Sequence, residues 1–276
     1  MFRTILITFI SLSVCFSISA QTVVPIYDIQ GVGDISPYED STVTTGGIVT
    51  DTSTGLGGFF LQDAAGDGNV NTSDGIFVYQ GGTPTVGIGD SITITGEVEE
   101  FFGLTELTNV SNLIFHWTTA TPITPTDLLL PVDSFPEHFE RLEGMLIRLP
   151  GDHVVADNYN LGRFGEVKLA PFDLVIPTDT LDPNDSPPSG TTTQGFANVV
   201  EVRNAVNRVE NHLITLDDMR SGANPNPIPW IDQASKTLRM GSSLTDFTGC
   251  MYYSFSQYRI VSSAAPAFNY APRPAV

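Results

Sequence analysis

The sequence has 276 residues, a formal net charge of −19 at pH 7 and two cysteines. Because acidic side chains outnumber basic ones by 31 to 12, the charge opposes strong, indiscriminate binding to nucleic-acid phosphates or anionic membranes. The length allows one large β domain or two small ones.

Residues 1–20, MFRTILITFISLSVCFSISA, are typical of a secretory signal peptide, because Arg3 precedes a short apolar run that ends before the small residue Ala20. The run is too short for a comfortable transmembrane helix, and no later segment approaches the ~20 apolar residues that a span needs. We therefore expect an exported protein, secreted to the extracellular space or periplasmic, with no membrane partner. Removal of the peptide takes Cys15 away, and we expect the remaining Cys250 to be a small, buried core residue.

Residues 21–120 have the pattern of a series of β-strands. Apolar and polar side chains alternate, Val, Ile, Thr and Phe are abundant, and Gly, Asn and Asp stand at the breaks. Glycines fall where a sheet would have to coil sharply. This pattern predicts a small barrel of the oligonucleotide/oligosaccharide-binding kind, here called OB-like. Its expected strands span 24–31, 41–52, 57–64, 74–80, 90–101 and 105–116.

The composition changes near Thr121, where we place a domain boundary. A Pro- and Thr-rich connection leads through an apparent helical turn in PEHFERLEGM to a second β-rich domain, residues 121–276, which ends in a Pro-rich linker. Two long Pro- and Asn-rich loops, 177–195 and 220–233, are expected on its surface. Its expected strands span 144–150, 165–171, 212–218 and 249–261.

One segment of the second domain departs from the β pattern. Its apolar residues recur at spacings of three and four, which predicts a short helix that ends before residues 212–218. The stripe consists of Val199, Val202, Val206, Val209 and Leu213. No short-period repeat is evident. The predicted fold class is therefore all-β, with an OB-like barrel followed by a second β-rich domain that has long loops and a short helix.

Several ordered motifs carry a resemblance that covers essentially all of the chain after residue 20. In order, they include YDIQG, GGFFLQD, TSDGIFVY, LEGMLIRL, YNLGRFGEVKLA and APRP. They are similar to the N-terminal, non-catalytic region of large secreted bacterial endonucleases of the ExeM/NucH type. The resemblance implies an OB-like domain and, C-terminal to this chain, a catalytic domain of the endonuclease/exonuclease/phosphatase superfamily. Mg²⁺ or Ca²⁺ is expected in that catalytic domain, because a divalent cation activates the water that cleaves a phosphodiester.

The residues present form no complete catalytic set. The four histidines lie far apart in the sequence, outside any compact metal-binding spacing, and we expect them to be structural. Asp217 and Asp218 are candidate metal ligands or acid/base groups, although paired acids at a strand end are commonly a solvated turn. We expect the chain alone not to be catalytic.

A loop rich in Asp, Asn and Gly lies between two expected strands, in QDAAGDGNVNTSDG. Its density of hard oxygen donors suits Ca²⁺ better than a transition metal, and a structural Ca²⁺ is one hypothesis. The alternative is a plain polar hairpin loop stabilised by Asx turns. The candidate metal ligands are Asp63, Asp67, Asn69, Asn71 and Asp74.

Aromatic and basic residues suggest a surface for nucleic acid. Outward-facing rings on the barrel strands can stack on bases, and the few arginines and lysines of the second domain can form a local basic strip. Core packing and salt bridges to the surplus carboxylates are the alternatives. The candidate nucleic-acid-binding residues are Phe60, Tyr79, Arg148, Arg163, Phe164 and Lys168.

Together these patterns predict a non-catalytic, nucleic-acid-binding accessory region of a secreted endonuclease. Its expected partners are extracellular DNA or RNA, bound weakly, and a C-terminal nuclease domain of the same polypeptide. The alternative is a free-standing secreted binding module for a polysaccharide or a protein, since OB barrels accept sugars as well as nucleotides.

Overall fold

A computed structural model describes residues 22–119, 123–132, 137–174 and 195–273. The predicted signal peptide, almost all of the loop 177–195 and the last three residues lie outside these ranges. Within them, no helix is long and apolar enough to cross a membrane.

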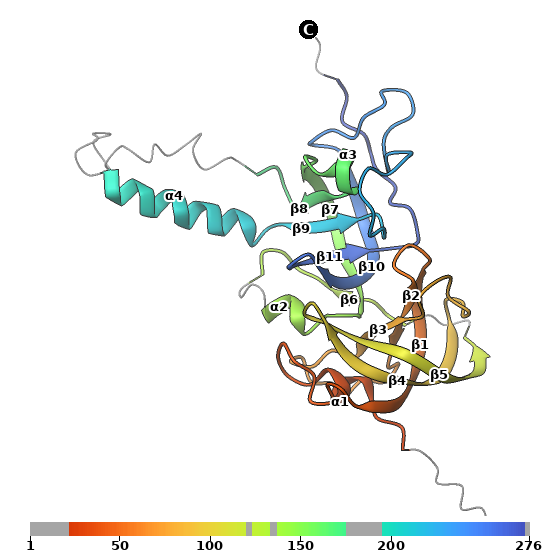
Figure 1. The fold of residues 1–276 in the computed structure, drawn as a ribbon. Helices are drawn as coiled ribbons and strands as arrows, with labels where there is room; N and C mark the ends of the chain where they lie inside the picture. Colours follow the sequence, from red (N-terminus) through yellow and green to blue (C-terminus); the bar gives the residue numbers. More distant parts are fainter. Residues whose placement is uncertain (1–21, 120–122, 133–136, 175–194, 274–276) are drawn as a thin grey trace, which may run out of the picture.

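The first domain is a closed five-stranded barrel, as predicted, with strand order β1-β2-β3-β5-β4 (Figure 1). All neighbouring strands are antiparallel except β3 and β5, which are parallel. Alternate residues point into the barrel, where Phe59, Leu61, Ile76 and Val78 are among the fully buried side chains. The strands are β1 (Thr42–Ser53), β2 (Gly58–Gln62), β3 (Gly75–Tyr79), β4 (Asp90–Phe101) and β5 (Leu104–Thr118).

The strand expected at residues 24–31 is instead mostly a short helix, α1 (Ile26–Gln30). Pro25 occupies the N-cap and Gly31 ends the helix with a φ of 69°, a left-handed conformation that suits glycine. Ile26 and Ile29, three residues apart, are both buried against the barrel. The three-residue spacing, not the alternation, therefore decides this segment.

The second domain is a six-stranded sheet with order β10-β11-β9-β8-β7-β6, and an additional pairing of β10 with β7 closes five of its strands into a ring, with β6 outside the ring. The strands are β6 (Thr126–Asp127), β7 (Leu146–Asp157), β8 (Val167–Ala170), β9 (Ile214–Asp217), β10 (Ser243–Ser254) and β11 (Gln257–Val261). The expected strand 249–261 is thus two strands joined by the turn Phe255–Ser256. The helices are α2 (Glu137–Glu140), α3 (Leu161–Phe164) and α4 (Gly195–Glu210).

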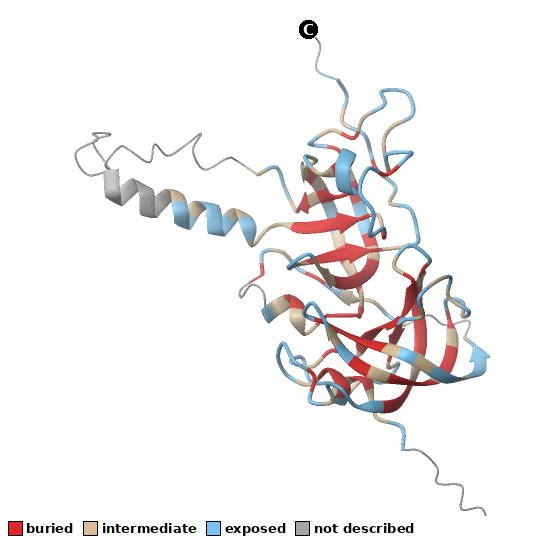
Figure 2. Ribbon diagram, in the orientation of Figure 1, coloured by how far each residue is buried: buried red, intermediate tan, exposed pale blue. Residues whose placement is uncertain are grey.

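Helix α4 confirms the helix predicted from the valine stripe and ends two residues before His212. It projects away from the sheet (Figure 1), and its described side chains are exposed or half-buried (Figure 2). Val206, for example, is 38% exposed.

The two domains repeat one topology. In the ring β7-β8-β9-β11-β10 the order and directions are those of β1-β2-β3-β5-β4, and the parallel pair β9–β11 corresponds to β3–β5. A short parallel contact precedes each ring, Val23 with Thr44 in the first domain and β6 with β7 in the second. A short helix follows each contact, α1 or α2. We therefore describe the protein as two successive barrels and refer to the first and the second barrel below.

An apolar seam joins the barrels. Phe60 and Phe77 lie on the outer face of the first barrel, 5.0 Å apart between ring centroids, and Tyr252 of the second barrel packs against both. Cys250 is fully buried in the same cluster, which confirms the prediction of a buried core thiol. Gly75 lies against Gly144 so closely that a Cβ atom on Gly75 would stand 2.3 Å from the carbonyl carbon of Gly144. The barrels therefore pack directly against each other along this seam.

Candidate functional site

Each barrel has a cavity at the same place in the repeated topology. The first-barrel cavity, about 440 Å³, is bounded by the β1–β2 connection, the end of β3 and the start of β5. The second-barrel cavity, about 220 Å³, is bounded by α3, the end of β9 and the hairpin of β10 and β11. Ser221 lines both cavities, so they adjoin across the domain boundary.

Exposed aromatic rings stand at the second-barrel cavity. Phe255 is 76% exposed and occupies the first position of the turn between β10 and β11 with a φ of 50°. A left-handed conformation is costly for a bulky residue, and such strain is often retained at functional positions. Phe164, at the end of α3, lines the same cavity, and the Arg163 guanidinium lies 4.9 Å from its ring centroid.

A buried ion network forms the floor of this cavity. Arg259 is only 1% exposed, and its guanidinium donates hydrogen bonds to Glu166 at 2.7 Å and to Asp217 at 2.6 Å. Burial, and then the neighbouring charge of Asp217, raise the pKa of Asp218 to about 6. The expectation that this acid pair is a solvated turn is therefore wrong: Asp217 is ion-paired inside the barrel and the Asp218 side chain is only 5% exposed.

The positive charge available to a ligand lies at the rim of the second-barrel cavity. The Arg220 side chain is 51% exposed and its Nε atom is 3.9 Å from the Asp218 carboxylate. Lys168, on β8, lines a small adjoining hollow that shares Asn160 and Glu166 with the cavity. Exposed rings beside cationic side chains are the combination that binds single-stranded nucleic acid.

The six residues expected to bind nucleic acid lie in different parts of the structure. Phe60 does face out of the first barrel, but the second barrel covers that face of β2, so the ring is fully buried in the seam and the expectation that it can stack on a base is wrong. Tyr79 is 43% exposed and lines the first-barrel cavity. Arg148 forms a two-point ion pair with Asp127, at 2.7 and 2.9 Å, as the salt-bridge alternative predicts. Arg163, Phe164 and Lys168 lie at or beside the second-barrel cavity.

The first-barrel cavity combines aromatic rings with carboxylates. Tyr79 and Phe101 line it, and both are partly exposed. Glu106 lies deeper and is 5% exposed. Burial, and then the negative charge of Glu99, raise the pKa of Glu106 to about 8. Its side chain is therefore held mainly as the neutral acid near pH 7.

The Asp-rich loop between β2 and β3 is closed by its own hydrogen bonds. Asp63 Oδ1 accepts from the backbone N–H groups of Ala65 and Gly66, at 2.9 and 3.2 Å. Asp67 Oδ1 accepts from the Asn69 N–H at 2.8 Å. In the same way, Asn69 Oδ1 accepts from the Asn71 N–H at 3.1 Å. These are the Asx turns of a polar hairpin loop.

These loop residues fit a calcium ion only in part. No three His, Cys, Asp or Glu side chains of the described residues are grouped as metal ligands. Asp74 nevertheless offers a buried Oδ1 atom without a hydrogen-bond partner, and burial followed by the charge of Asp67 raises its pKa. Asp74 thus has one oxygen without a partner, although its carboxylate accepts a hydrogen bond from the Asp67 backbone, and Asp63 and Asp67 also accept hydrogen bonds within the loop.

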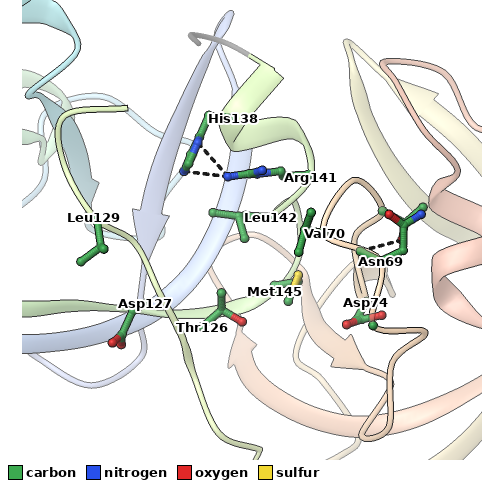
Figure 3. A pocket seen from close by; sticks show the side chains of 12 residues that line it. Asn69, Val70, Asp74, Thr126, Asp127, Leu129, His138, Arg141, Leu142 and Met145 are labelled. Atoms are coloured by element: carbon green, nitrogen blue, oxygen red, sulfur yellow. Dashed lines mark hydrogen bonds between the residues drawn. The ribbon is translucent and has the colours of Figure 1, made fainter. Parts of the chain in front are cut away.

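A third cavity, about 390 Å³, lies between this loop and α2 (Figure 3). Figure 3 shows Asn69 and Asp74 on the loop side and His138 facing Arg141 on the side of α2. Apolar side chains, including Met145, line the space between them. The cavity offers an apolar surface, and its polar groups stand mostly at the edges.

Sequence reasoning missed Phe255, Arg220, Phe101 and Glu106. Phe255 lies in SFSQ, which contains neither the Gly nor the Asn typical of a hairpin turn, so the sequence pattern predicts one strand here instead of two. Alternation places Glu106 on the face of Leu104, but only the second barrel explains why that face is buried. The available signal was the match between the two hairpins, each of which begins its turn with Phe, at 102 and 255.

No family model matches the sequence, and neither does any curated protein.

Proposed function

We propose that the chain is a non-catalytic, nucleic-acid-binding accessory region of a secreted, metal-dependent endonuclease, with the catalytic domain C-terminal to it. The observation that carries the binding part is the second-barrel cavity, which Phe164, Phe255 and Arg220 line, with the Arg163 guanidinium 4.9 Å from the Phe164 ring centroid. The motif resemblance carries the nuclease part. Any catalytic Mg²⁺ or Ca²⁺ belongs to the C-terminal domain in this proposal.

The distribution of charge along the chain favours the second barrel over the first as the nucleic-acid-binding part. Residues 21–120 contain no Lys or Arg, so the first barrel carries an almost wholly acidic set of ionisable groups and repels phosphates. Every basic residue after the predicted signal peptide lies beyond residue 120. A strand would therefore place its phosphates near Arg163 and Arg220 and stack bases on the exposed rings.

The binding should be weak and independent of sequence. Few cations face the ligand, and the chain as a whole carries a net charge of −19. Stacking on an aromatic ring accepts any base, because every base has a π-face. This suits a region that concentrates extracellular DNA or RNA near a nuclease.

One observation favours the alternative, a free-standing secreted module for a polysaccharide or a protein. The acidic first barrel also exposes rings, with Phe102 85% exposed and Trp117 59% exposed. Aromatic rings with carboxylates suit sugar hydroxyls, which carry no charge to be repelled. Binding to oligosaccharides together with no binding to oligonucleotides selects this alternative.

The test measures the binding of fluorescein-labelled dT12 and rU12 oligonucleotides, with fluorescence anisotropy as the readout, at 50 and 200 mM NaCl. Phe255→Asn removes the ring and keeps a residue that tolerates the left-handed turn. We expect it to weaken binding about tenfold, the value of one base–aromatic stack. The matched control is Phe102→Asn, the same change at the equivalent turn of the first barrel.

Charge is tested in the same way. Arg163→Gln should weaken binding and reduce its salt dependence, whereas Lys236→Gln, which removes an equal charge outside the cavity, should not. Purified chain with Mg²⁺ or Ca²⁺ should release no nucleotides. Absence of binding at 50 mM NaCl, or equal losses in the two Phe variants, contradicts the proposal.

A further inference from the structure

The first-barrel cavity has features that nucleic-acid binding in the second barrel does not use. Glu106 is the third residue of β5, is 5% exposed and lines the cavity. Among the described residues its carboxyl group has no hydrogen-bond donor or ion-pair partner. A carboxyl group that is largely withdrawn from water and has no protein partner is costly, so its retention calls for an explanation.

A second carboxylate lies directly across the sheet. Glu99 on β4 is the register partner of Glu106 on β5, so the two side chains share one face of the barrel. Like charges in this arrangement repel each other, and nothing basic balances them, since no residue that lines this cavity is Lys, Arg or His. The ionisable side chains that line the cavity are therefore acidic.

In the second barrel, the position equivalent to Glu106 holds a charged side chain whose partners come from the protein itself. Arg259 is the third residue of β11, as Glu106 is of β5. Its guanidinium lies between the carboxylates of Glu166 and Asp217, with the Phe255 ring centroid 5.6 Å away. There the protein supplies both the carboxylates and the cation from its own chain.

The first barrel supplies the carboxylates and the rings without the cation. Tyr79 and Phe101 are partly exposed and line the cavity, and Tyr252 closes it from the second barrel. Cations are attracted to the faces of such rings, most strongly when they are withdrawn from water. A volume of about 440 Å³ has room for a charged group together with an apolar body.

We propose that the first-barrel cavity binds an organic cation, an ammonium or guanidinium group carried on an alkyl chain. Glu106 accepts hydrogen bonds from its N–H groups, Glu99 adds a second negative charge, and the rings of Tyr79 and Phe101 contact the alkyl chain and the cation. Charge-assisted hydrogen bonds of this kind are roughly twice as strong as neutral ones. Aromatic walls and two carboxylates suit such a ligand better than Ca²⁺, which takes six to eight oxygen ligands.

The experiment titrates the full chain with three probes in an isothermal calorimeter: n-butylammonium, n-butylguanidinium and spermidine. We expect at least one of them to bind with a dissociation constant of about 1 mM or tighter. Neutral n-butanol tests the contribution of the alkyl chain alone, and guanosine tests a nucleobase whose N–H donors would face the same carboxylate. Oligonucleotides are not needed, so the result stands apart from the proposed function.

Two variants and one control locate the binding. Glu106→Gln keeps the shape and removes the charge, and should weaken binding at least tenfold. Glu39→Gln makes the same charge change at an exposed residue outside the cavity and should bind as the wild type does. If Glu106→Gln does not fold, Tyr79→Leu at the partly exposed rim takes its place and should also weaken binding.

Three results would overturn the proposal: no cation binds at 50 mM probe, the cations bind equally well to Glu106→Gln, or guanosine or n-butanol binds more tightly than the cations. A shift of the Glu106 side-chain carboxyl ¹³C signal on addition of n-butylammonium, toward the value of the ionised group, would support it directly. That signal should not move with n-butanol.

Discussion

Replacing Glu106 with Gln should stabilise the protein, and should do so more at high pH than at low pH. The carboxyl group is buried in the first-barrel cavity without a partner, which raises its pKa to about 8 from the ordinary value of 4.5. Below pH 4.5 both the folded and the unfolded chain hold the proton, so this group gives no penalty. Above pH 8 the folded protein must carry a buried charge that the unfolded chain solvates freely.

The magnitude follows from the two pKa values. Between pH 4.5 and 8 the free energy of unfolding loses about 1.4 kcal/mol per pH unit through this group. The full loss is thus at most about 5 kcal/mol, and about 4 kcal/mol of it falls between pH 5 and 9. Gln carries no charge at any of these pH values and escapes the loss.

The assay is urea unfolding of the wild type and of Glu106→Gln at pH 5 and pH 9. Other buried carboxyl groups with raised pKa values, such as Glu143, titrate in both proteins, so the difference between them isolates Glu106. We expect the stability advantage of the variant to grow by a few kcal/mol from pH 5 to pH 9, with no such growth for Glu39→Gln. An advantage that stays constant, or that shrinks as pH rises, would refute the reasoning.

Three further predictions concern the seam, the ion network and the Asp-rich loop. Gly75→Ala forces a methyl group into the backbone of Gly144, and should cost about 3 kcal/mol in urea unfolding; an unchanged midpoint contradicts the close approach of the barrels. Arg259→Met leaves two buried carboxylates without their cation and should cost about 3–5 kcal/mol at pH 7, with a smaller loss at pH 4, because burial raises the pKa of Asp217 and lets this carboxylate take up a proton. If Ca²⁺ binds at the free oxygen of Asp74, 1 mM CaCl₂ should raise the Tm of the wild type and not that of Asp74→Asn; equal Tm values in CaCl₂ and EDTA discard the calcium hypothesis.

The strands of the first barrel could be predicted because each of them buries one face in a single interior. Phe59 and Leu61 alternate with Phe60 in the sequence, and the barrel interior takes the first two. The destination of Phe60 could not be predicted in the same way. It depends on Tyr252, nearly two hundred residues away, and no local pattern announces that contact.

The repeated topology was hidden for a related reason. The order of strands depends on which edges pair, and the parallel contact of β9 with β11 joins residues some forty positions apart. Insertions differ as well, since α4 connects to β9 where the first barrel has the Asp-rich loop between β2 and β3. The residues of the candidate sites could be predicted only in part. Arg163 and Phe164 were visible in the sequence as a rare charge and a ring, whereas Phe255 and Glu106 stand out only when the hairpins of the two barrels are compared position by position.

The most direct test of nucleic-acid binding by the second barrel is to map where a bound strand contacts the protein. A dT12 oligonucleotide in which 5-bromodeoxyuridine replaces thymidine cross-links under near-ultraviolet light to aromatic side chains on which it stacks. Peptide mass spectrometry should find the cross-links at Phe255 and Phe164. Cross-links at Tyr79 or Phe102 in their place, or no cross-link at 50 mM NaCl, would contradict the account.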